Sequence, residues 1–283
     1  EQCDLAVADR VRTLILPDRW SAAGWQSVEF ERRFGGISRL YGTAGLAALR
    51  SARVAVIGVG GVGSWAVEAL LRSGVETLLL VDPDHVAESN INRQLPALSD
   101  TLGRSKVAVL SERAVSINPD VRIEGVEEFL APENLAEIID DSANWVIDCI
   151  DNFRVKAALI AHCRRRKQNV ISVGGAGGQR DAGRVRISDL RRTEQDPLLA
   201  RTRKLLRQEY GFPSNPKRRF NVPCVWSDEP QSAPMGDCGT GQDSSLNCAG
   251  FGACMSVTAT FGLVAAGHVV NAIAATGGPG VDR

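Results

Sequence analysis

The chain has 283 residues, in which 33 Lys and Arg balance 33 Asp and Glu. This length is ample for the core of one large α/β domain, with or without an appendage. Its seven cysteines contain no C-x-x-C pair, which excludes the common structural zinc motifs, and no zinc is expected. Their odd number without framework spacing favours reduced thiols in the cytoplasm over disulfide bonds.

A glycine-rich turn follows residues 53–57, an apolar, β-branched run expected to form a buried parallel strand. Five small residues shape the turn: Gly58, Gly60, Gly61, Gly63 and Ser64. Such a turn lets the backbone approach a ligand and starts a helix whose N-terminus attracts phosphate. The next expected strand, residues 77–82, delivers Asp82, an acid suited to ribose hydroxyls. The same pattern is typical of dinucleotide-dependent dehydrogenases, and it can also serve packing alone.

Two cations after Asp82 favour a nucleotide triphosphate over a dinucleotide. The polar loop that follows this strand contains Arg93, whose planar guanidinium group suits phosphate oxygens. Lys106 stands in the first turn of the next expected helix, where its charge opposes the helix dipole. An anionic ligand would offset that cost. The alternative is that both side chains are solvated surface cations.

The expected strand at residues 144–148 ends in Asp148, and a second carboxylate, Asp151, follows three residues later. The carboxyl end of a central strand lies over the same crevice as the glycine turn. Asp151 is therefore predicted to hold Mg²⁺, which takes one or two protein carboxylates and completes its shell with water and phosphate. The alternative is that Asp151 or Asn152 caps the following helix, and the two roles are compatible.

Strands and helices alternate from residue 53 to residue 173. Strands are expected near residues 53–57, 77–82, 121–126, 144–148 and 169–173. This order predicts an α/β fold with a doubly wound, Rossmann-like, mainly parallel sheet and helices on both faces. A C-terminal extension of strands and helices should follow, with strands at 183–188 and 221–226. Residues 213–247 are rich in Pro, Gly, Ser and Asp and indicate a long mobile loop.

The net charge of zero hides a strongly basic segment. Residues 154–219 hold 18 Lys and Arg against 5 Asp and Glu, a local excess of 13 positive charges. Such a field suits a polyanion, because phosphate contacts dominate the affinity of proteins for nucleic acids. The alternative is a solvated helix face at residues 198–209, with the leucines of that helix packed inward.

Residues 249–275 contain no Asp, Glu, Lys or Arg. The segment is long enough to span a bilayer, but its many small residues suit tight packing in a protein core or a dimer interface. Burial in the core or a dimer interface is the favoured interpretation, and membrane or organellar association is the open alternative. His268 is expected to be a structural histidine of this helix.

Five motifs occur in order: Gly58-x-Gly-Gly-x-Gly63-Ser64, Asp82, Ser89-Asn90-x-x-Arg93-Gln94, Lys106 and Asp148-x-x-Asp151-Asn152. Together they resemble the ubiquitin-activating-enzyme-like adenylyltransferases, which include the thiamine- and molybdopterin-biosynthesis enzymes. The resemblance implies that ATP and Mg²⁺ are the cofactors, that Asp82 binds the ribose and that Asp151 serves the metal. The residues implied around the nucleotide are Gly58, Gly60, Gly61, Gly63, Ser64, Asp82, Ser89, Asn90, Arg93 and Lys106.

Five further segments extend the similarity from about Phe30 to His268. They are residues 33–42, 174–179, 195–198, 248–253 and 257–262. These segments resemble the tRNA threonylcarbamoyladenosine dehydratases. That resemblance implies an ATP-dependent dehydration, or cyclisation, of the modified nucleoside in tRNA through a carboxyl-adenylate. It also implies a homodimer, in which Arg33 or Arg39 would reach the partner subunit's site.

Cys248 occupies the place of a candidate reactive cysteine in the resembled family. A buried structural thiol is the alternative, since reactivity would need an exposed thiolate in electropositive surroundings. A second function therefore stays open, in which the chain activates a sulfur-carrier or ubiquitin-like protein through Cys248, with a sulfur-transfer partner. A third is a non-enzymatic nucleotide-sensing or membrane-scaffold module.

The expected organisation is one adenylyltransferase-like domain over residues 29–275. Residues 1–28 form a poorly defined N-terminal extension, and residues 276–283 a tail. Within the domain the parts are a nucleotide-binding core (53–178), a basic insertion with a mobile loop (179–248) and the apolar helix (249–275).

Overall fold

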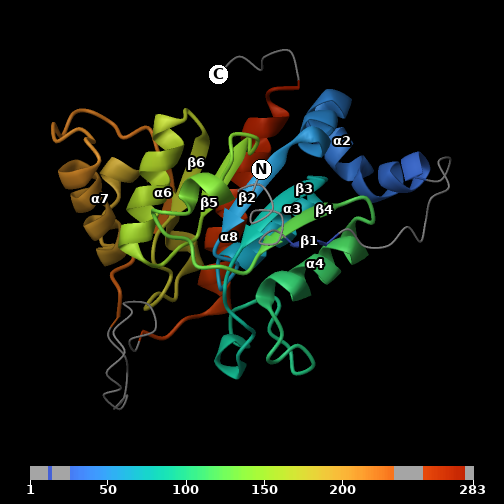
Figure 1. Cartoon of the computed structure of the whole chain (residues 1–283), viewed down its shortest axis with the longest axis horizontal. Helices are drawn as coiled ribbons and strands as arrows, with labels where there is room; N and C mark the ends of the chain where they lie inside the picture. The colour runs from blue at the N-terminus through green and yellow to red at the C-terminus, as the bar shows by residue number, and fades with distance from the viewer. Residues whose placement is uncertain (1–11, 15–25, 233–250, 278–283) are drawn as a thin grey trace, which may run out of the picture.

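A central sheet organises the computed structural model, which describes residues 12–14, 26–232 and 251–277 (Figure 1). Its eight strands lie in the order β1-β4-β3-β2-β5-β6-β8-β7. Their bounds are β1 Arg12–Leu14, β2 Arg53–Ile57, β3 Thr77–Val81, β4 Arg122–Val126, β5 Trp145–Asp148, β6 Asn169–Val173, β7 Val185–Asp189 and β8 Pro223–Ser227. The strands from β4 to β8 in this order pair in parallel, and the two edge strands, β1 and β7, are antiparallel to their neighbours. The predicted doubly wound, mainly parallel α/β fold is confirmed.

Seven helices cover the two faces of this sheet within the described residues. Their bounds are α2 Gln26–Ser51, α3 Gly63–Arg72, α4 Lys106–Ile117, α5 Leu135–Ile138, α6 Phe153–Arg165, α7 Pro197–Glu209 and α8 Met255–Ala274. Short 3₁₀ turns are η1 Glu88–Asn90, η2 Ala182–Arg184 and η3 Leu190–Arg192. Helix α2 is kinked at Gly42, where φ is 75° and the backbone is not helical.

Alternation along each strand divides the core into two layers. In β2, Val54 and Val56 belong to one buried cluster, and Ala55 and Ile57 to the other. The first cluster packs the sheet against α3, α4 and α8, and the second packs it against α5, α6 and α7 (Figure 1). Successive side chains of a strand point to opposite faces of the sheet, and this alternation produces the division.

Helix α8 is the apolar segment of the sequence, and it begins at Met255 rather than near residue 249. It has the length and composition of a membrane span, but 61% of its most apolar window is buried within the domain, which favours the core interpretation. Its Gly262 fits directly against the start of α3, because an added Cβ would lie 2.3 Å from the carbonyl oxygen of Val62. His268 packs edge-on against Trp145, with ring centroids 5.5 Å apart, as a structural histidine would.

One part of the sequence-based prediction of secondary structure was incomplete. Strand β1 at residues 12–14 lies in the segment expected to be poorly defined, and it pairs with the distant strand β4, which local composition does not indicate. Strand β8 confirms the strand expected at 221–226, and it falls inside the stretch 213–247 that was also expected to be a long loop. Residues 233–247 of that stretch lie outside the described part of the chain.

Candidate functional site

A cavity of about 900 Å³ opens at the carboxyl ends of the central strands. It lies where β2 and β5 meet, the point at which the order of the strands reverses and where open α/β sheets bind ligands. The glycine turn, the end of β3, the loop around η1, the start of α6 and the loop after β6 all contribute to its wall. Ten predicted residues line it together: Gly58, Gly60, Gly61, Gly63, Asp82, Ser89, Asn90, Arg93, Lys106 and Asp151.

The glycine turn has a conformation that larger residues would not allow. Gly58 has a φ of +83°, and its N–H donates to the carbonyl oxygen of Val81 at 2.8 Å. At Gly63 an added Cβ would lie 1.8 Å from the carbonyl oxygen of Gly58, so the turn closes on itself there. No side chain caps α3, which begins at Gly63. The positive end of its dipole is therefore available at the cavity.

Ser64, a predicted nucleotide-binding residue, does not line the cavity. Its side chain is buried beneath the turn, where Oγ donates to the carbonyl oxygen of Gly60 at 2.6 Å. The same Oγ accepts a hydrogen bond from the N–H of Leu95 at 3.2 Å. Ser64 therefore joins the turn to the loop that carries Arg93.

Asp82 is held in place by the turn next to it. Its carboxylate accepts hydrogen bonds from the N–H groups of Val59 at 2.7 Å and Asp84 at 2.9 Å. Burial raises the pKa of Asp82, and the nearby charge of Lys106 opposes that shift. A carboxylate has about four acceptor positions, so these two donors leave others for the hydroxyls of a ligand.

Lys106, at the start of α4, and Arg93, in the loop after η1, bring positive charge to the cavity. The side chain of Lys106 is only 5% exposed, and its Nζ lies 2.8 Å from Oδ2 of Asp84. The surface-cation alternative is therefore wrong for Lys106. Arg93 is half-buried and donates from Nη1 to the carbonyl oxygen of Ser89 at 2.8 Å and to Oδ1 of Asn92 at 2.9 Å.

Asn90 is buried and supports the loop around η1. Its Oδ1 accepts from the N–H of Ala87 at 3.1 Å, which closes the short 3₁₀ turn. Trp65 of α3 donates from Nε1 to the carbonyl oxygen of Arg93 at 3.0 Å. The loop that carries Arg93 is thus fixed to the helix that follows the glycine turn.

The two carboxylates after β5 have different environments. Asp151 is exposed at the cavity, and the cap of α6 is Asn152, whose Oδ1 accepts from the N–H groups of Arg154 and Val155. Asp148 is wholly buried and pairs with Lys156 at 2.8 Å, so the expectation that both carboxylates face the crevice is wrong for Asp148. Among the described residues no group of three or more His, Cys, Asp or Glu could hold a metal. A single carboxylate nevertheless suits Mg²⁺ bound largely through phosphate and water.

Asp196 has a structural role that the sequence analysis did not assign. It is buried, caps α7 by accepting from the N–H of Leu199, and accepts from the N–H of Gly175 at 2.9 Å. An added Cβ on Gly174 would lie 2.1 Å from its Oδ2. Asp196 therefore holds the loop after β6, which lines the cavity, against the start of α7. Asp followed by Pro197 is a recognisable helix-start signal and could have revealed the cap.

The cysteines near the cavity differ in their thiol pKa. Cys149 lines the cavity, but burial raises the pKa of its thiol to about 12, which disfavours the reactive thiolate. Cys254 is exposed, and hydrogen bonds with Ser256 lower the pKa of its thiol. Cys248 lies outside the described residues.

Arg33 and Arg39 lie on α2 and do not line this cavity. Arg33 donates from Nη1 to the carbonyl oxygen of Ile117 at the end of α4, at 2.9 Å. Both side chains are exposed.

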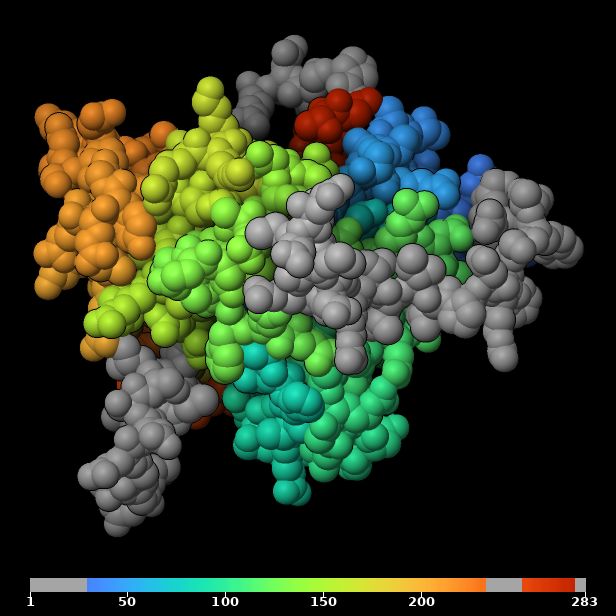
Figure 2. Space-filling model, in the orientation of Figure 1, coloured from blue at the N-terminus to red at the C-terminus, as the bar shows by residue number. Residues whose placement is uncertain are grey.

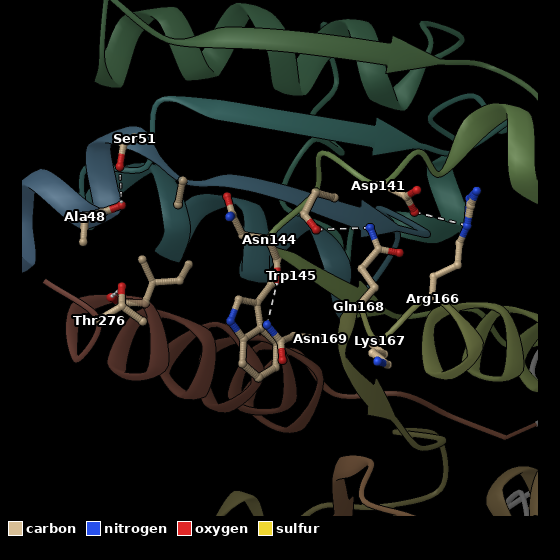
Figure 3. Close-up of a pocket in the computed structure, with 13 residues that line it drawn as sticks. Ala48, Ser51, Asp141, Asn144, Trp145, Arg166, Lys167, Gln168, Asn169 and Thr276 are labelled. Atoms are coloured by element: carbon tan, nitrogen blue, oxygen red, sulfur yellow. Dashed lines mark hydrogen bonds and ion pairs between the residues drawn. The ribbon is translucent and has the colours of Figure 1, made fainter.

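A second, smaller cavity of about 380 Å³ lies at the amino ends of β5 and β6 (Figure 3). In its wall, Gln168 donates from Nε2 to the carbonyl oxygens of Asp140 and Ala143, and Arg166 pairs with Asp141 at 3.1 Å. None of the predicted site residues lines it. The larger cavity is therefore the candidate functional site.

Comparison with known proteins agrees with this location. A model of the ThiF family matches residues 35–281. The chain is 49% identical over 243 residues to the tRNA threonylcarbamoyladenosine dehydratase of Haemophilus influenzae, covering 86% of this chain and 93% of the relative. It is 41% identical over 266 residues to the Escherichia coli enzyme of that name, covering 91% of this chain and 96% of the relative.

Solved structures of the E. coli enzyme also match. Its complex with ATP has a TM-score of 0.81 and 42% sequence identity, and the match covers 89% of this chain and 97% of that chain. Its complex with AMP has a TM-score of 0.80 and 41% identity, covering 93% of this chain and 98% of that chain.

Proposed function

The chain belongs to the ThiF family, and on that premise we propose that it is an ATP-dependent tRNA threonylcarbamoyladenosine dehydratase. One observation carries the proposal: the glycine turn, Asp82, Arg93 and Lys106 line one cavity, in a fold that matches an enzyme solved with ATP. A dehydrogenase would have no need of the Mg²⁺ that Asp151 is proposed to hold. The localisation that fits such an enzyme is the cytoplasm, where tRNA is available.

The cavity offers a complementary group for each part of ATP. Asp82, fixed by two backbone donors, accepts hydrogen bonds from the ribose hydroxyls. The uncapped start of α3 and the side chains of Arg93 and Lys106 bind the phosphates. Helix α6 also begins beside the cavity, after its cap Asn152, and adds the positive end of its dipole.

Asp151 is the residue that would hold Mg²⁺. Its carboxylate is exposed at the cavity and is not needed as a helix cap, because Asn152 has that role. When bound, the metal would neutralise charge on the phosphates.

The reaction begins when an oxygen of the threonyl carboxylate attacks the α-phosphorus of ATP. The bond to the β-phosphate breaks, pyrophosphate leaves, and the carboxylate becomes an acyl-adenylate. The carbamoyl group of the same side chain then attacks the acyl carbon, and AMP leaves with the former carboxylate oxygen. The ring closes with the net loss of one water, and the attack is fast because both groups belong to one nucleoside. Arg93 and Lys106 stabilise the negative charge on the departing pyrophosphate.

No protein nucleophile is required, since the acceptor is internal to the substrate. The thiol of Cys149, with its pKa raised to about 12, is consistent with that chemistry. Cys248 is proposed to have no covalent role. A Cys248→Ser variant should retain full turnover, and a total loss of activity would instead favour activation of a sulfur-carrier or ubiquitin-like protein with a sulfur-transfer partner.

We also propose that the active form is a homodimer, in which Arg33 or Arg39 reaches the partner subunit's cavity. Both are exposed on α2 and lie away from their own cavity, as that arrangement requires. Mixing an Arg39→Ala chain with an Asp151→Ala chain should restore part of the activity if the sites are shared between subunits.

The decisive experiment supplies tRNA that carries the linear modification, with and without ATP, and measures the mass of the nucleosides. We expect the loss of one water only when ATP is present. Tight binding of a nicotinamide dinucleotide without any response to ATP would contradict the proposal and favour an oxidoreductase.

A further inference from the structure

Four contacts between an arginine and an aromatic ring fall within residues 153–220. The guanidinium carbons of Arg154 and Arg201 lie 5.6 Å and 5.9 Å from the ring centroid of Phe153. Arg165 lies over Tyr210 and Arg191 over Phe220, each at 5.8 Å. The basic segment thus places arginines beside aromatic rings at several points. Arginine interleaved with aromatic rings is a surface suited to nucleic acid rather than to solvent alone.

The first of these groups lies at the rim of the candidate site. We call Phe153, Arg154 and Arg201 the rim cluster. Phe153 is the first residue of α6, and its neighbours Asn152 and Val155 line the cavity. Leu198, one helical turn before Arg201 in α7, also lines it. The rim cluster thus borders the cavity from two helices.

Helices α6 and α7 pack against each other and lie side by side at one end of the molecule (Figures 1 and 2). Each has 13 residues and begins at the cavity. The contact between Arg165 and Tyr210 joins the C-terminal ends of the two helices, which lie away from the cavity. A helix of this length extends about 20 Å. The arginine–aromatic contacts therefore mark both ends of a surface that is long enough to follow a nucleic-acid backbone.

The charges of the rim cluster are not used within the domain. Arg184 and Arg186 of the same basic segment pair with Asp228, and Lys156 pairs with Asp148. In contrast, neither Arg154 nor Arg201 forms an ion pair with any residue in the described parts of the chain, and both are exposed. Their guanidinium groups remain able to bind an external anion.

We propose that the rim cluster clamps the RNA strand on either side of the nucleotide that enters the cavity. Arg154 and Arg201 bind the flanking phosphates through their N–H groups, and Phe153 holds both guanidinium groups in position. The surface of α6 and α7 then carries the adjoining backbone. This inference rests on the proposed function, because it takes the polyanion to be tRNA. Recognition of an unstacked nucleotide with phosphate contacts beside it is how proteins commonly read single-stranded RNA.

The test is the variant Arg154→Ala/Arg201→Ala in the full-length chain. Its matched control is Arg72→Ala/Arg122→Ala, which removes two exposed arginines from the other half of the sheet. Filter binding measures the affinity for tRNA at several salt concentrations, and calorimetry measures the affinity for ATP without tRNA. Because binding is measured apart from turnover, the clamp can be judged even where no product forms.

We expect the rim variant to bind tRNA at least about tenfold more weakly than the parent. The slope of the logarithm of the binding constant against the logarithm of the salt concentration should become shallower by about 1.4, because two phosphate contacts on a single strand are lost. Its affinity for ATP should stay within about twofold of that of the parent, because the two arginines are proposed to contact the RNA and not the nucleotide in the cavity. The control should bind tRNA like the parent. The conservative variant Arg154→Lys/Arg201→Lys should recover the salt dependence, since it keeps two charges.

Unchanged tRNA affinity in the rim variant would overturn the inference, and so would an equal loss in the control. An equal loss of ATP affinity would also overturn it, because the arginines would then be supporting the cavity. Failure of the proposed function has a different signature: the parent chain would make no dehydrated nucleoside from ATP and the linear tRNA, whatever the rim variant binds.

Discussion

Lys156 and Asp148 form an ion pair 2.8 Å long in which neither side chain has any exposed surface. The pair lies directly beneath the loop of Asp151, because Asp148 is the last residue of β5 and its Oδ1 accepts from the N–H of Ile150 at 3.1 Å. Ser172 of β6 donates to the same carboxylate at 2.7 Å. The ion pair therefore fixes the strand end from which the candidate metal ligand extends.

Removing one member of this pair should destabilise the fold. Lys156→Met leaves the buried Asp148 uncompensated, and we expect the free energy of unfolding to fall by about 3–5 kcal/mol. Urea-induced unfolding followed by circular dichroism provides the measurement. The double variant Lys156→Met/Asp148→Asn should recover more than half of the loss, since the amide keeps an acceptor for Ser172. Equal stability of Lys156→Met and the parent would contradict the role given to the pair.

Gly63→Ala should abolish ATP binding and lower the melting temperature. The added methyl group would lie 1.8 Å from the carbonyl oxygen of Gly58, so the glycine turn has to open. The matched control is Gly267→Ala in α8, where an added Cβ meets nothing within 4 Å. Alanine in a helix is favoured over glycine by about 1 kcal/mol, so the control should melt at the same temperature or higher. Thermal unfolding and ATP calorimetry on both variants provide the measurement. Normal ATP binding and an unchanged melting temperature in Gly63→Ala would contradict the role given to the turn.

Lys106→Ala should weaken binding of ATP far more than binding of adenosine. A hydrogen bond to a charged group contributes about 1.5–3 kcal/mol, so its loss should lower the affinity for ATP roughly 10- to 100-fold. Adenosine has no phosphates, so its affinity should change little. Arg104→Ala is the control, because Arg104 is exposed on the same loop and pairs with Glu112. Equal losses of affinity for ATP and for adenosine would show that Lys106 only supports the loop of Asp84, with which it pairs.

Asp151→Ala should abolish ATP–pyrophosphate exchange while leaving the fold intact. The side chain is exposed and caps no helix, so the free energy of unfolding should change by no more than about 0.5 kcal/mol. Asp100→Ala removes an equally exposed carboxylate away from the cavity and should retain exchange. Exchange measured across a Mg²⁺ titration would reveal whether a high metal concentration rescues the Asp151 variant. Undiminished exchange at low Mg²⁺ would refute the assignment.

Acid should destabilise the packing of α8 through His268. Burial lowers the pKa of His268, so the folded state binds its proton less readily than the unfolded chain does. The stabilisation is present above the ordinary histidine pKa of about 6.5 and is lost as the pH falls through the lowered value. Urea unfolding at pH 7.5 and at lower pH should show a steeper loss for the parent than for His268→Gln. Parallel losses in both proteins would exclude this contribution.

The sequence predicted best those features that depend on local signals. The glycine turn and the alternation of strands and helices between residues 53 and 173 rest on residue types that force a backbone conformation or a period. Ser64 was assigned to the nucleotide from its motif, but it is buried beneath the turn, because Gly60 and Leu95 provide its partners. Whether a polar side chain faces a ligand or the protein depends on tertiary contacts that spacing does not contain.

Buried polar networks were the least predictable part of the site. Asp148 was expected at the crevice, but Lys156, eight residues later, and Ser172 of the next strand neutralise it inside the core. Asp196 joins two segments that are 21 residues apart, at Gly175 and the start of α7. Such contacts become visible only when the strands are placed side by side.

Helix α8 makes the phosphate-binding turn depend on a distant part of the chain. The helix packs Gly262 against the carbonyl oxygen of Val62, at the start of α3 where the glycine turn ends. It begins at Met255, about 190 residues after Gly63 in the sequence. A chain truncated before Met255 would keep every residue of the turn and lose the helix that packs against it.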